Sequence, residues 1–63
     1  MAQTTKKQLA SRHVRRLRTM RTQLLEMAKL WEDLDQYNVN EMVGLADQAE
    51  IVAINLIDDE ADL

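Results

Sequence analysis

The residues with the strongest chemical character in this chain are arginines gathered near its beginning. Five fall within ten positions with no acid among them: Arg12, Arg15, Arg16, Arg18 and Arg21. Guanidinium groups bind phosphate and carboxylate in bidentate geometry. At about 100° per helical residue, Arg12, Arg15 and Arg18 point away from the apolar seam of the first predicted helix. These three are candidates for binding an anionic partner or nucleic acid, with a plain solvated face as the alternative, whereas Arg16 and Arg21 are expected to form salt bridges.

Nothing in the sequence is typical of catalysis or of a metal site. His13 is the only histidine, and Ser11, two residues away, points in another direction on a helix. The chain has no cysteine, which excludes disulfides and makes a zinc site unexpected. The carboxylates of residues 32–35 are interpreted as solvated groups near a helix end. We therefore expect no enzyme activity, no cofactor and no metal.

Charge divides the chain into two halves of opposite sign. Residues 1–31 carry eight bases and one acid, a net charge of +7, and residues 32–63 carry ten acids and no base, a net charge of −10. An antiparallel hairpin would set these halves side by side and help to fix which helix pairs with which. Four acids near the end are candidates for binding a basic partner, with simple solubilisation as the alternative: Asp58, Asp59, Glu60 and Asp62.

The length and composition indicate a helical chain that needs a partner. A chain of 63 residues is too short to bury a large core, and without cysteines it depends on oligomerisation or on docking to another molecule. The composition, with no proline and one glycine, favours helix. No apolar run is long enough to cross a membrane or to resemble a signal peptide, so the expected location is the cytoplasm.

A first helix is predicted over residues 6–35, after a tail at 1–5. Thr5 and Gln8 fit a capping box. Residues at alternating spacings of three and four form a coiled-coil seam, which we expect to be buried, with Trp31 as its largest anchor. The seam consists of Ala10, His13, Leu17, Met20, Leu24, Met27, Trp31 and Leu34.

The apolar repeat of the first helix breaks at Asn38, and this break indicates a turn. Asn38 and Glu41 fit a second capping box, so a turn is predicted at 36–38, a second helix at 39–57 and an acidic tail at 58–63. The alternative is one continuous helix that absorbs a four-residue stutter. With a turn at 36–38, the first helix is the longer and overhangs the second. The main seam of the second helix is expected to contain Met42, Leu45, Ala49, Val52 and Leu56, and Gly44 is expected to allow close helix approach.

The second helix is apolar on more than one side, because residues 51–57 contain a single polar side chain. One neighbouring helix covers only one stripe, so the fold class predicted is an all-α, two-helix antiparallel hairpin that dimerises into a four-helix, coiled-coil-like bundle. The candidates for the partner or dimer interface are Leu17, Met20, Leu24, Met27, Trp31, Ile51, Ile54 and Ile57.

Several features resemble the Rop family of small plasmid proteins, which form dimers of helical hairpins and bind paired RNA loops. They are the chain length, Leu24-Leu25-Glu26, the run from Leu45 to Glu50 and an acidic end that finishes in Leu63. The resemblance implies a dimeric four-helix bundle. The predicted turn falls several residues later than in that family, and no RNA-binding residue carries over.

Together these patterns favour a small, non-enzymatic, homo-oligomeric protein that regulates by binding another protein. It would be of the kind that phages and plasmids encode to inhibit or adapt a host factor. One alternative is binding of RNA or DNA through the arginine-rich face of the first helix. The other alternative is a structural or scaffolding subunit of a larger assembly.

Overall fold

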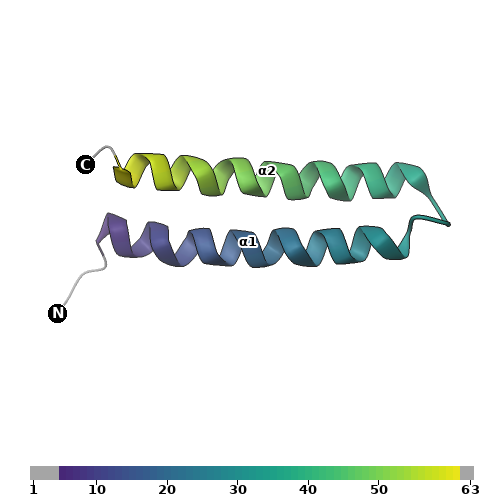
Figure 1. Ribbon diagram of the computed structural model, residues 1–63, viewed down its shortest axis with the longest axis horizontal. Coiled ribbons are helices and arrows are strands. Elements are labelled where there is room, and N and C mark those ends of the chain that lie inside the picture. Colours follow the sequence, from purple (N-terminus) through teal and green to yellow (C-terminus); the bar gives the residue numbers. More distant parts are fainter. Residues whose placement is uncertain (1–4, 62–63) are drawn as a thin grey trace.

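The protein is a pair of antiparallel helices, shown in Figure 1. This computed structural model describes the backbone of residues 5–61 and the side chains of residues 5–57. Helix α1 spans Lys6–Leu30 and helix α2 spans Gln36–Ala61, and the two pack along their length. The predicted all-α fold with two helices is confirmed. The alternative of one continuous helix is wrong.

Helix α1 begins where the sequence predicts. The Gln8 backbone N–H donates to the Thr5 hydroxyl at 3.1 Å, and the Thr5 N–H donates to the Gln8 side-chain oxygen at 3.1 Å. These reciprocal bonds satisfy two donors that the first turn of a helix leaves free. The predicted capping box is therefore confirmed.

The turn lies earlier than predicted, over residues 31–34 instead of 36–38. The Trp31 N–H bonds back to the Ala28 carbonyl at 3.0 Å, and the Leu34 and Asp35 N–H groups both donate to the Trp31 carbonyl at 2.9 Å. No residue of the described chain has a positive φ. Because the turn uses only conformations open to ordinary residues, it needs no glycine or proline, and its position carries no such marker.

Asp35, not Asn38, caps helix α2. Its carboxylate accepts from the Tyr37 backbone N–H at 3.0 Å and from the Asn38 side-chain amide at 2.8 Å. The carboxylates of Glu32 and Asp33 also precede α2, near the positive end of its dipole.

The corrected turn makes the helices nearly equal in length. Helix α1 has 25 residues instead of the predicted 30, and α2 starts three residues earlier and continues four residues further, to Ala61. The predicted overhang of the first helix is therefore wrong. The later position predicted for the turn, which distinguished this chain from Rop, is also wrong.

Asp35→Ala is expected to destabilise the protein by about 1 kcal/mol, because it removes the acceptor for the Tyr37 N–H. Urea unfolding followed by circular dichroism measures this change. Asp33→Ala is the matched control, since Asp33 is an exposed turn carboxylate, and it should stay within about 0.5 kcal/mol of the parent. Equal effects of the two changes would contradict the assignment of Asp35 as the cap.

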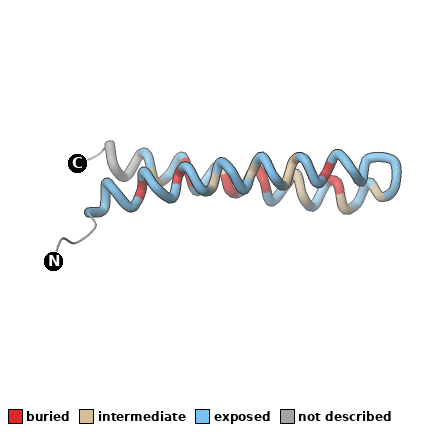
Figure 2. The backbone as a smooth tube through the Cα atoms, turned by 90° about the horizontal axis from the view of Figure 1, so that it is seen from below, coloured by how far each residue is buried: buried red, intermediate tan, exposed pale blue. Residues whose placement is uncertain are grey.

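The contact between the helices is built from small side chains. Figure 2 shows most of the chain exposed, with buried positions scattered along both helices. Ala46 and Ala53 are 0% exposed, and no large side chain is fully buried. The buried residues are Ala10, Val14, Ala28, Val39, Ala46, Ala49 and Ala53.

The face of α1 that meets α2 is rotated from the one predicted. Positions 10, 14, 17, 21, 24 and 28 are buried or half-buried, at the same alternating spacings of four and three. The predicted row of His13, Met20 and Met27 is exposed instead. Trp31, expected in the core, lies in the turn and is 38% exposed.

Helix α2 departs from its predicted seam in a similar way. Ala49 is buried and Met42 and Leu56 are half-buried, but Leu45 and Val52 are exposed. Their places against α1 are taken by small residues, Ala46 and Ala53. The helices do not approach each other closely at Gly44, because a Cβ at this position would meet no atom within 4 Å.

Gly44→Ala should therefore stabilise the protein by about 0.5–1 kcal/mol, through lower backbone entropy of the unfolded chain and better helix propensity. The midpoint of urea unfolding measures the gain. The matched control is Ala46→Gly at a fully buried site, which should destabilise. A loss of stability in Gly44→Ala would show that this position is packed.

The two helices form a single layer. The Cα atoms span 50 × 24 × 10 Å, so the shortest dimension is that of one helix. Both broad faces are therefore open. Neither α1 nor α2 is long and apolar enough, over the described residues, to cross a membrane.

Candidate protein-interaction surface

An apolar groove runs between the helices along one broad face. It has a volume of about 410 Å³. Helix α1 and helix α2 both contribute to it, and only Gln23 and Gln48 among its lining residues are polar. The apolar lining consists of Leu17, Met20, Leu24, Met27, Leu45, Ala49 and Val52, which we call the groove residues.

The groove exists because the seam is narrow. The alanines of α2 let the helices approach, and the larger side chains at neighbouring positions then stand at the edge of the contact. Met20 is 45% exposed, Met27 44% and Leu45 58%. Flexible methionines on an open apolar face suit a surface that packs against another helix.

The groove continues toward the open end of the hairpin, where the chain begins. A further hollow there is lined by His13, Arg16 and Leu56 together with groove residues of both helices. Beyond it, Leu9, Ala10 and Lys6 line a smaller hollow against Leu56. His13 is thus part of this open face and does not lie between the helices.

The structure gathers four of the eight predicted interface residues in one place. Leu17, Met20, Leu24 and Met27 line the groove. Trp31 lies in the turn. By helical geometry the isoleucine row of α2 (Ile51, Ile54 and Ile57) winds along the opposite side of that helix, and none of the three lines the groove.

Sequence reasoning missed the α2 half of the groove. Leu45 and Val52 were assigned to the contact within the hairpin, whereas both face outward into the groove. The available signal was the width of the apolar stripe on each helix, which exceeds what one neighbour can cover.

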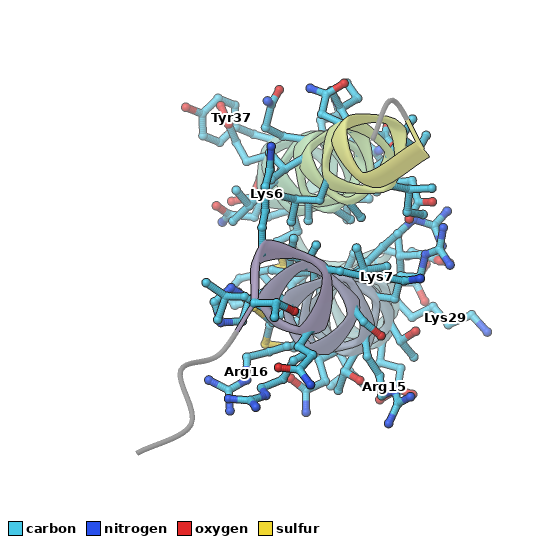
Figure 3. All side chains as sticks on the ribbon, turned by 90° about the vertical axis from the view of Figure 1, so that its left-hand side faces the viewer. Lys6, Lys7, Arg15, Arg16, Lys29 and Tyr37 are labelled. Atoms are coloured by element: carbon cyan, nitrogen blue, oxygen red, sulfur yellow. The ribbon has the colours of Figure 1, made fainter. Side chains whose placement is uncertain are left out.

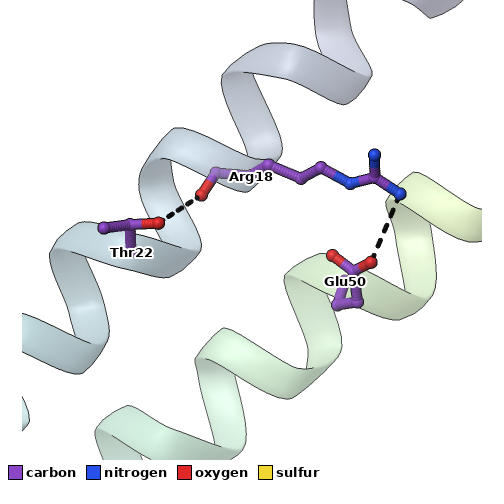
Figure 4. Close-up of polar contacts among 3 residues, drawn as sticks. All are labelled: Arg18, Thr22 and Glu50. Carbon is purple, nitrogen blue, oxygen red and sulfur yellow. Dashed lines mark hydrogen bonds and ion pairs between the residues drawn. The ribbon is translucent and has the colours of Figure 1, made fainter.

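Arg18 takes part in the fold, which corrects its predicted outward role. Its Nη2 lies 3.4 Å from Oε1 of Glu50 on α2, as Figure 4 shows. The Arg18 side chain is 51% exposed and that of Glu50 30%. Arg16 and Arg21, the predicted salt-bridging pair, make no ion pair among the described residues.

Arg15 and Arg16 project from the side of α1 that faces away from α2. Figure 3, viewed along the helices from the open end, shows Arg16 directed to one side and Arg15 to the other. Arg12 and Arg15 line a shallow hollow with Lys7, Gln8 and Ser11, and no acid lines it. Of the three predicted anion-binding arginines, Arg12 and Arg15 thus share a basic surface.

Arg21 lies at a seam position between the helices. The residue is half-buried, and its Nε is buried without a hydrogen-bond partner. A polar atom of this kind costs free energy that an apolar side chain would not. The Nε of Arg21 therefore adds no hydrogen bond to the contact between α1 and α2.

Two acidic clusters were singled out in the sequence, one at residues 32–35 and one in the tail. Asp35 is the cap of α2, and no group of three or more possible metal ligands occurs among the described residues. The tail candidates Asp58, Asp59, Glu60 and Asp62 lie outside the described side chains.

No protein-family model matches this chain, and comparisons with curated proteins and with solved structures found no significant match. The resemblance to Rop therefore rests on the residues quoted for it alone. What the chain does must be argued from its surfaces.

Arg18→Glu is expected to lower stability by about 0.5–1 kcal/mol, since it removes an exposed ion pair and sets two carboxylates side by side. Arg12→Glu and Arg15→Glu are the matched controls and should unfold at the same urea concentration as the parent. A comparable loss in all three variants would mean that the whole cluster serves the fold.

Proposed function

We propose that this chain is a homodimeric, non-enzymatic regulatory protein that acts by binding another protein. The observation that carries the proposal is the apolar groove, because the hairpin leaves its largest apolar side chains uncovered. The occupant proposed for the groove is a second copy of the chain, which would complete a four-helix bundle.

The composition of the groove supports a second copy as the occupant. Both helices contribute to the groove. A two-fold axis would therefore bring the groove residues of one copy against the groove residues of the other. Two hairpin layers stacked in this way would bury methionines and leucines that one layer cannot cover. Such an arrangement satisfies the need for a partner that the short, cysteine-free chain implies.

The isoleucine row of α2 supports contact with a different protein. Ile51 is 50% exposed and Ile54 44%, on the side of the helix away from the groove. The row would remain open in the dimer. By helical geometry the exposed Asp47 lies on the same side, so the matching partner surface is apolar with a basic edge.

A second candidate function is supported by the basic hollow on α1. Lys7, Arg12 and Arg15 line it without an acid, an arrangement suited to the phosphates of RNA or DNA. Binding of this kind weakens steeply with salt, whereas contact through apolar groups does not. The net charge of −3 opposes it, and we place it second.

Leu45→Lys should raise the dimer dissociation constant at least about 100-fold, because an ammonium group buried in the groove costs several kcal/mol. Sedimentation velocity over a range of concentrations measures this change. Ile51→Lys is the matched control on the same helix, with similar exposure but outside the groove, and should leave the dimer intact. A parent protein that sediments as a monomer at every concentration would refute the homodimer, and equal effects of the two lysines would refute the groove as its interface.

A further inference from the structure

A two-fold axis can place a second copy on the groove in two ways. In one, the axis runs along the helices, α1 packs on the partner's α2, and both turns lie at the same end. In the other, the axis crosses the helices, α1 packs on the partner's α1, α2 packs on the partner's α2, and the turns lie at opposite ends. Every neighbouring pair of helices is antiparallel in both, so helix dipoles do not decide between them.

The charges of the two helices do distinguish the arrangements. Helix α1 carries eight bases and one acid, a net charge of +7, and α2 carries six acids and no base, a net charge of −6. With both turns at the same end, each basic helix lies between two acidic ones. With the turns at opposite ends, the basic helices adjoin each other and the acidic ones do the same. Juxtaposed like charges cost free energy, so the first arrangement is favoured.

Arg16 is the residue whose charged surroundings differ most directly between the two arrangements. It lines the open end of the groove and projects from α1 on the side away from α2, as Figure 3 shows. In the opposite-end arrangement it would meet the partner's α1, which carries a net charge of +7. In the same-end arrangement it would meet the partner's α2, which has no base anywhere along its length.

The sizes of the groove side chains also favour the arrangement with both turns at the same end. The α1 edge of the groove carries two leucines, two methionines and a glutamine, whereas the α2 edge combines Leu45 and Gln48 with the smaller Ala49 and Val52. In the register indicated by the ion pair of Arg18 with Glu50, Met20 lies level with Gln48 and Ala49. The same-end arrangement therefore places Met20 opposite the partner's Gln48 and Ala49. In the opposite-end arrangement, the long side chains of α1 would crowd the same long side chains of the partner's α1. The smaller side chains of α2 would face those of the partner's α2.

We infer that two copies associate with their turns side by side, so that each α1 packs on the partner's α2 in a four-helix bundle of alternating charge. This inference rests on the proposed homodimer and adds to it the pairing of the helices.

Pulsed electron paramagnetic resonance of spin-labelled chains tests the pairing. The sequence has no cysteine, so Asp33→Cys places one label in the turn of the full-length chain at an exposed position. Same-end pairing should give a distance between the two labels below about 25 Å, because neighbouring helices pack about 8–10 Å apart. Opposite-end pairing would give about 40 Å, since each helix is about 37 Å long.

Lys7→Cys, exposed at the other end of α1, provides the matched position and should also give a short distance. A chain labelled at both positions and diluted into unlabelled protein supplies an internal ruler of about 37 Å, the length of α1. Long distances from both single labels would overturn the pairing and leave the homodimer standing. The absence of any distance between chains would overturn the homodimer and the pairing together.

Discussion

The contact between α1 and α2 is made by small side chains, and most other properties of the molecule follow from that contact. Ala46, Ala49 and Ala53 bring α2 close to α1, but alanines remove little apolar surface from water. Larger side chains beside this seam, among them Met20, Met27 and Leu45, remain exposed at its edge. The narrow seam thus buries little apolar surface and leaves an apolar groove beside it, and it is the reason that we propose a second layer of helices.

The polar groups at the seam do little to strengthen it. Arg21 occupies a position between the helices and leaves its Nε without a partner. Arg18 pairs with Glu50 across the edge, but exposed pairs of this kind contribute less than about 1 kcal/mol. The pair is consistent with the register of the helices. In the homodimer that we propose, association would add stability to that of the single layer.

The turn illustrates how charge and capping locate an element when no glycine or proline marks it. Glu32, Asp33 and Asp35 form the acidic cluster that sequence reasoning interpreted as solvated carboxylates. Asp35 bonds the first turn of α2, and its two neighbours lie at the favourable end of that helix. The turn was predicted too late because Asn38 and Glu41 also match the sequence pattern of a capping box. Two candidate caps three residues apart can be ranked only when the hydrogen bonds are known.

The sequence by itself determined the helical character of the chain, its two-helix organisation, the capping box at Thr5 and the separation of charge between its halves. These properties depend on local propensity, on short-range hydrogen bonds and on the alternation of apolar residues. The tertiary structure decided which part of each apolar stripe faces the other helix. On α1, the row of Val14, Arg21 and Ala28 lies inward and the row of Met20 and Met27 lies outward, although both rows fit a heptad repeat. A repeat specifies a stripe but not its midpoint, and close packing of two backbones selects the smaller side chains for the contact.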